Sequence, residues 1–163
     1  MIGEDDIFYY DGTNKPPIDV EKIIVKDGVT KIKDEVFFNC SLLQSIIIPD
    51  SVTEIGITSF SYCTSLRKIT IPSSVNIINI LAFYECHSLE SITIPSSVAE
   101  VKEYAFCNCT SLKEIKISSS VIKIEKDAFE GCASLRSITI PKRFSDKLDY
   151  IGIDEGKTKV EFY

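Results

Sequence analysis

The sequence contains no tryptophan, a single histidine, and no apolar run long enough to cross a membrane. A spanning helix needs about 20 consecutive, mainly apolar residues, so the sequence predicts no membrane insertion. Lysine and arginine never occupy more than two adjacent positions, and the net charge is −6. An acidic chain without a basic cluster is not expected to bind nucleic acid or anionic lipid electrostatically.

The N-terminal residues also lack the features of a secretory leader. Residues 1–6 are acidic where a signal peptide is basic, and no apolar core segment follows them. The C-terminal residues 161–163 do not form a lipidation motif. We therefore expect a cytoplasmic protein, with surface association by a non-classical route as an open alternative.

What the sequence does contain is a repeat of 23 residues. Phenylalanine, cysteine and leucine each recur at this spacing without a slip. The three columns are Phe37, Phe60, Phe83, Phe106 and Phe129; Cys40, Cys63, Cys86, Cys109 and Cys132; and Leu43, Leu66, Leu89, Leu112 and Leu135. A fixed period in this range is typical of a solenoid, in which each coil stacks on its neighbours.

Each repeat predicts a coil with two short strands. The pattern Leu-x-x-Ile-x-Ile alternates with period two around Ile69 and Ile71, which indicates a strand. Pro72 ends it because proline donates no hydrogen bond to a ladder. Val75 and Ile78 predict a second inward-facing segment, and the Ala-Phe pair that follows begins the return arc.

The repeat unit IPxSVxxIxxxAFxxCxSLxxI resembles the BspA-like leucine-rich repeats of bacteria and several protists. It is clearest in Pro72–Val75 with Ala82–Leu89, and in Pro95–Val98 with Ala105–Leu112. The resemblance implies an α/β-type repeat solenoid, right-handed and curved, with a parallel β-sheet on the concave face, short strands and turns on the convex side, and no catalytic residues. Known members are mostly surface or adhesion proteins, so binding of extracellular ligands is the alternative function.

The pattern predicts one domain of three parts. Residues 1–19 read as an N-terminal cap, residues 20–141 as about six coils, and residues 142–163 as a C-terminal cap with a last strand. The two atypical ends predict a complete small solenoid. Open ends expose strand edges, which permit a homo-oligomer.

We call the outward side of the Leu-x-x-Ile-x-Ile strands the concave face, and we expect it to bind a protein partner. Ile24 and Ile47 are apolar where solvent is expected. They form a contact patch, or simply suit a strand, or lie under the N-terminal cap. The predicted partner-binding residues are Ile24, Ile47, Lys68, Thr70, Ser91, Thr93, Glu114 and Lys116.

The C-terminal residues carry a second binding hypothesis. Lys159, Val160 and Phe162 match the [Arg/Lys]-[Val/Ile]-x-[Phe/Trp] motif that docks regulatory subunits onto the protein phosphatase 1 catalytic subunit, an extended mode of recognition. However, Val160 follows Ile138 by 22 residues, close to the repeat spacing. The same segment is therefore also predicted as the last strand of the core.

The reactive side chains do not form a recognisable catalytic or metal-binding set. Five of the six cysteines are repeat positions, so we expect reduced, buried packing thiols. Cys107 falls in a slot held by Ser61 and Tyr84 in other coils and is expected to be partly exposed. His87 is expected to face outward. No catalytic residue, metal or cofactor is predicted, and the chain is interpreted as a non-catalytic protein–protein interaction module.

Overall fold

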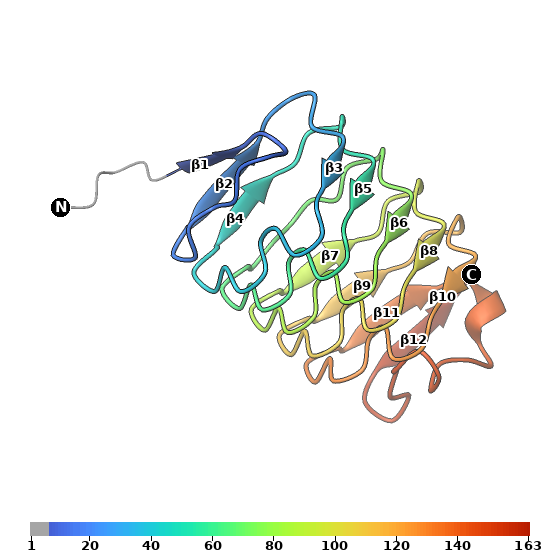
Figure 1. The fold of residues 1–163 in the computed structure, drawn as a ribbon. Coiled ribbons are helices and arrows are strands. Elements are labelled where there is room, and N and C mark those ends of the chain that lie inside the picture. Colours follow the sequence, from blue (N-terminus) through green and yellow to red (C-terminus); the bar gives the residue numbers. More distant parts are fainter. Residues whose placement is uncertain (1–6) are drawn as a thin grey trace.

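The chain winds into a parallel-strand solenoid in the computed structural model, which describes residues 7–163. Residues 1–6 of the predicted N-terminal cap lie outside the described part. Two rows of short strands run along opposite sides of the coils, from the blue end to the red end (Figure 1). The predicted fold class is confirmed.

The concave row is divided into two sheets. In the first, β1 (Ile7–Tyr10), β2 (Lys22–Val25) and β4 (Ser45–Ile47) pair in that order. In the second, the order is β7 (Ser91–Thr93), β9 (Glu114–Lys116), β11 (Ser137–Ile140) and β12 (Lys159–Phe162). The intervening coil adds a single parallel bridge, Lys68 with Ser91.

The convex row is one continuous sheet, which we call the convex sheet. It consists of β3 (Lys31–Ile32), β5 (Glu54–Ile55), β6 (Ile77–Ile78), β8 (Glu100–Val101) and β10 (Lys123–Ile124). The one helical segment of residues 7–163 is the 3-10 helix η1 (Lys142–Phe144), directly after Pro141. The strands stay short because proline and the turn residues interrupt each one.

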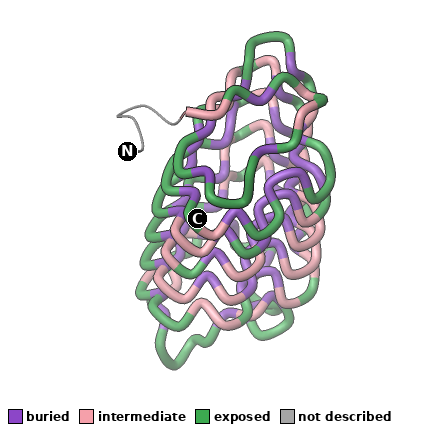
Figure 2. Tube along the Cα trace, turned by 60° about the vertical axis from the view of Figure 1, so that its left-hand side comes forward, coloured by how far each residue is buried: buried purple, intermediate pink, exposed green. Residues whose placement is uncertain are grey.

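The register between coils equals the sequence repeat. Ile23 pairs with Ile46, and Ile92 pairs with Ile115, so each inward side chain sits on the equivalent side chain of the next coil. The inward leucine, isoleucine and valine positions are buried, whereas the outward strand positions are mostly exposed (Figure 2). The 23-residue period therefore determines which side chains form the core.

A column of stacked aromatic rings runs through the core. Phe37, Phe60, Phe83, Phe106 and Phe129 follow one another with ring centroids 5.2 to 5.6 Å apart. Tyr10 adds a sixth ring at the N-terminal end, 5.2 Å from Phe37 and edge-on to it. A residue before the first repeat thus covers the N-terminal end of the column.

The cysteine column ties each return arc to the preceding coil. The Cys86 thiol donates to the Phe60 carbonyl at 3.2 Å, and the Cys109 thiol donates to the Phe83 carbonyl at the same distance. Cys63 and Cys132 repeat the contact at 3.3 Å. A small thiol that reaches a carbonyl explains why cysteine recurs in this slot.

The last turn continues the backbone pairing of the repeat in part but lacks its core side chains. Phe129 N donates to Ile151 O at 2.9 Å, as Phe106 N donates to Ala128 O in the coil before, whereas Asp127 N donates to Tyr150 O, one residue further along than in the earlier arcs. At the next column positions, 23 residues beyond the last phenylalanine, cysteine and leucine, the chain has Gly152, Glu155 and Thr158. The sequence of the last turn therefore does not show the repeat, although part of the backbone hydrogen bonding of the repeat continues.

Candidate functional site

The predicted concave-face residues lie together on one surface. Ile24 and Ile47 are register partners across β2 and β4, and Thr93 and Lys116 are partners across β7 and β9. The remaining predicted residues, Lys68, Thr70, Ser91 and Glu114, are exposed between or beside them. Their placement on this face agrees with the sequence pattern, and their role in binding stays a prediction.

The N-terminal end of this face is apolar. Ile47 is 63% exposed, and the cap does not cover it, because β1 pairs beside β2 and not above it. This pairing places Tyr9, which is 50% exposed, next to the half-buried Ile24. Tyr9, Ile24 and Ile47 form a small apolar patch, of which the sequence predicted only the two isoleucines.

The concave face has both paired and unpaired lysines: Lys113 pairs with Glu90 at 2.7 Å and Lys159 pairs with Glu161 at 2.6 Å. On the convex sheet, Lys31 pairs with Glu54 at 2.8 Å and Lys123 pairs with Glu125 at 2.7 Å. On the concave face, Lys68 and Lys116 form no ion pair within residues 7–163. The concave face therefore presents ammonium groups that are free to meet an external acceptor.

The Lys159–Phe162 segment is an ordered strand. It pairs with β11 over four residues, with Val160 opposite Ile138 as the spacing predicts. Thr158, just before it, is buried and donates to the Leu135 carbonyl at 3.0 Å. Val160 packs against the core, whereas the Phe162 side chain remains 43% exposed.

The prediction for Cys107 is wrong, because its side chain is buried and Cys132 is the more exposed thiol. Cys132 is half-exposed because the next arc brings Glu155 in place of another cysteine. Burial raises the pKa of Cys107 to about 11 and the pKa of Cys132 to about 12. Thiols with raised pKa values are poor nucleophiles at neutral pH.

His87 faces outward as predicted, and its ring does not activate a thiol. Its Nε2 lies 2.5 Å from Glu85 Oε2. Burial alone would raise the pKa of Glu85, but hydrogen bonds from Asn108 and His87 outweigh it and lower the pKa. This pair belongs to an inter-coil network, because Asn108 Nδ2 also donates to Glu85 across one repeat at 2.8 Å.

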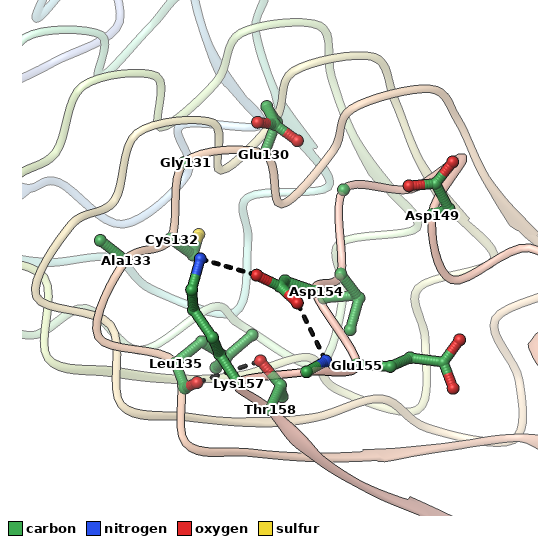
Figure 3. Close-up of a pocket in the computed structure, with 13 residues that line it drawn as sticks. Glu130, Gly131, Cys132, Ala133, Leu135, Asp149, Asp154, Glu155, Lys157 and Thr158 are labelled. Carbon is green, nitrogen blue, oxygen red and sulfur yellow. Dashed lines mark hydrogen bonds and ion pairs between the residues drawn. The ribbon is translucent and has the colours of Figure 1, made fainter.

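A hollow of about 600 Å³ opens where the last turn lacks its core side chains. Leu135 and Cys132 form its inner wall, and the loop around Asp154 forms the outer wall (Figure 3). Lys157 Nζ pairs with Asp154 at 2.7 Å, and Asp154 also accepts from the Gly156 amide at 2.9 Å. The hollow results from the missing core side chains of the last turn, and an exposed ion pair lines it.

A second hollow, of about 560 Å³, lies on the concave face itself. Its floor contains Thr93, Lys116 and Thr139, and its walls include Pro95 and Tyr163. Tyr163 has no equivalent in the repeats, so the sequence pattern gave no reason to place it here. The sequence pattern identifies Lys116, Thr93 and Thr139 as outward-facing residues, but it does not indicate a hollow between them.

Within residues 7–163, no group of three or more histidine, cysteine, aspartate or glutamate side chains is arranged to hold a metal ion. The same residues include no helix long and apolar enough to span a bilayer.

The stacked coils, the phenylalanine column and the two parallel strand rows define a repeat solenoid of the leucine-rich-repeat class. A family model for the BspA type leucine rich repeat region matches residues 30–151 in 6 copies. The chain belongs to this family. A comparison with curated proteins found no match.

Solved structures with the same fold come from bacteria. A leucine rich cell surface protein from Faecalibacterium prausnitzii is 32% identical, with a TM-score of 0.75, over 87% of this chain and 38% of that chain. The T. pallidum Leucine Rich Repeat protein is 31% identical, with a TM-score of 0.71, over 74% and 58% of the two chains. A Bacteroides ovatus leucine-rich repeat protein is 26% identical, with a TM-score of 0.60, over 97% and 36%. This chain thus covers less than two thirds of each of these structures.

Proposed function

We propose that the chain is a non-catalytic binding module that receives a protein partner on its concave face. The observation that carries the proposal is a set of unmatched groups on the concave face. Its apolar patch (Tyr9, Ile24, Ile47) is accessible to solvent, and Lys68 and Lys116 form no ion pair within residues 7–163, whereas both lysines of the convex-sheet strands, Lys31 and Lys123, are paired. A surface whose groups are left unmatched on a rigid scaffold is suited to recognition.

Site-specific photo-crosslinking tests this proposal. Benzoylphenylalanine replaces Ile47 or Thr93 on the concave face, or Ile122, an exposed residue next to the convex sheet, as the matched control. In extracts of the producing organism, we expect the same partner to be cross-linked at positions 47 and 93 but not at 122. Equal labelling at position 122 would contradict a dedicated concave face.

The location of the partner is a separate part of the proposal. The Faecalibacterium relative is described as a cell surface protein, which supports a surface role with extracellular ligands over the cytoplasmic role expected from the N-terminal residues. Labelling of intact cells with a membrane-impermeant biotin reagent distinguishes the two. Biotinylation before lysis supports the surface role, and protection until lysis supports the cytoplasmic one.

Docking to a protein phosphatase 1 catalytic subunit is a second candidate. It is favoured by one observation: Phe162 and Lys159 are exposed on β12, the outermost strand of its sheet within residues 7–163. A pull-down with wild type and Phe162→Ala tests it, with circular dichroism on both. Binding that is lost while the fold is retained supports docking, and the absence of wild-type binding rejects it.

A further inference from the structure

The hollow in the C-terminal half of the concave face has an ordered floor. Thr93, Lys116 and Thr139 are mutual register partners on β7, β9 and β11. Adjacent parallel strands lie about 4.8 Å apart, so a hydroxyl group stands on each side of the lysine. The three side chains come from three rigid strands, which fixes their spacing before any ligand arrives.

Tyr163 gives the hollow a fixed aromatic wall. Its hydroxyl donates to the Ile117 carbonyl at 2.5 Å, two coils away along the chain, and its main-chain oxygen accepts from the Lys142 amide at 3.0 Å. The residue is held at both ends and is still 52% exposed. Pro95 also lines this hollow. A ligand group that enters the hollow therefore meets two rigid apolar surfaces.

Lys116 is the unmatched charge in this hollow. Two nearby carboxylates pair with other lysines: Glu161 pairs with Lys159 at 2.6 Å, and Glu90 pairs with Lys113 at 2.7 Å. Glu114, two residues before Lys116 on the same strand, forms no ion pair with it in the described residues. The Lys116 ammonium is therefore free to pair with an external carboxylate.

We propose that this hollow binds a protein segment in which an aspartate or glutamate lies beside an aromatic or aliphatic residue. The ligand carboxylate pairs with Lys116 and accepts hydrogen bonds from Thr93 and Thr139, while the apolar side chain packs between Pro95 and Tyr163. A volume of about 560 Å³ accommodates such a pair of side chains. This inference rests on the proposed protein-binding function and names the chemistry of the partner.

Peptide display on the full chain tests the inference. A random dodecapeptide library is selected against wild type, and enriched peptides are labelled with fluorescein for anisotropy titrations. We expect enriched sequences to pair an acidic residue with an apolar one. Lys116→Met, which keeps the apolar stem, should raise Kd at least fivefold, and so should replacement of the acidic residue of the peptide by its amide.

Lys113→Met is the matched control, because it removes a concave-face lysine that already has a partner. Its Kd should stay within twofold of wild type, and circular dichroism should show that all variants are folded. Enriched peptides without an acidic residue, or peptides that bind Lys116→Met as well as wild type, overturn the inference and leave a protein-binding face in place. Failure to enrich any peptide also overturns it, whereas the wider proposal is judged by the cross-linking at positions 47 and 93.

Discussion

Phe83 shows how one side chain stabilises two neighbouring coils at once. Its ring stacks on Phe60 and on Phe106, each at 5.2 Å, and it is fully buried. Aromatic pairs at this distance add to the effect of burial itself. Its loss therefore removes contacts with the coil before and the coil after.

Replacing Phe83 by alanine should lower the free energy of unfolding by about 3 to 5 kcal/mol. The matched control is Phe38→Ala, because Phe38 is an exposed ring that contacts Tyr62 edge-on. We expect that change to cost less than about 1 kcal/mol. Urea titration followed by far-UV circular dichroism measures both, and equal losses would contradict a central role for the phenylalanine column.

The buried thiols predict a loss of stability at high pH. Burial raises the pKa of Cys86 from an ordinary value of 9.0 to about 12. The unfolded chain loses this proton above pH 9 while the folded chain retains it, so folding is favoured below pH 9 and less favoured as pH rises toward 12. Each such thiol reduces stability by up to about 1.4 kcal/mol per pH unit in that window.

Comparison of wild type with Cys86→Ala isolates this effect from the titration of lysine and tyrosine. The variant should be less stable at pH 7, because it loses the bond to the Phe60 carbonyl. Between pH 9 and pH 11 its stability should fall less steeply than that of wild type in denaturant titrations. Identical slopes would show that the thiol ionises equally in both states.

At the scale of elements, the weakest point of the concave row is the coil between β4 and β7. Residues 67–70 form one bridge, Lys68 with Ser91, and no ladder with β4 within the described chain. The convex sheet and the aromatic column continue across the same coil without a break. The interruption is therefore local to one side of the solenoid.

Hydrogen exchange should detect this interruption. We expect the backbone amides of residues 67–71 to exchange faster than those of residues 90–94, which occupy the same repeat positions one coil later and include β7. Peptide-resolved deuterium uptake at neutral pH, measured on one sample, supplies both values. Equal protection of the two segments would mean that the coil is paired in solution on both sides.

The terminal strand β12 should contribute to stability through Val160 more than through Phe162. Val160 packs against the core, whereas Phe162 is largely on the surface. Val160→Ala should lower the melting temperature by a few degrees, consistent with about 1 kcal/mol, and Phe162→Ala should change it less. The reverse order in thermal scans would show that Phe162 is the residue that anchors the strand.

The sequence predicts the coil well because its inward positions repeat at one spacing. Leu66, Ile69 and Ile71 have equivalents in every coil, so the core and both strand rows follow from the period. The last turn is different: Gly152 and Thr158 stand 23 residues after Phe129 and Leu135 but carry no apolar signature. The burial of Cys107 and the position of Tyr163 depend on packing between coils, which no single repeat reveals.

At the scale of the whole molecule, each coil is stabilised mainly by its neighbours. The strands are two to four residues long and pair only with equivalent strands of adjacent coils. One isolated coil cannot bury both of its faces, and nearest-neighbour contacts therefore make the array cooperative. The unfolding of one coil exposes the faces of two others.

We expect a single unfolding transition for the whole chain. Phe60→Ala and Phe106→Ala lie on opposite sides of the coil at residue 83, and each should lower the same midpoint in urea with little change in m value. Circular dichroism and hydrogen exchange should report the same midpoint. Two separate transitions, with the earlier one confined to residues 7–66, would show that the break beside β4 divides the solenoid into two cooperative units.

The hydrogen bonds between return arcs, such as Phe83 to Ala105 and Phe106 to Ala128, connect each coil to the next along the long axis of the molecule. Tension applied between the first and last coils would load these bonds one layer at a time, in a peeling geometry, and not all together in shear. Such a molecule resists compression through its packed rings but extends coil by coil under modest force. The coils are mechanically nearly equivalent layers. A partner bound across several strands would connect these layers and raise the force needed to separate them.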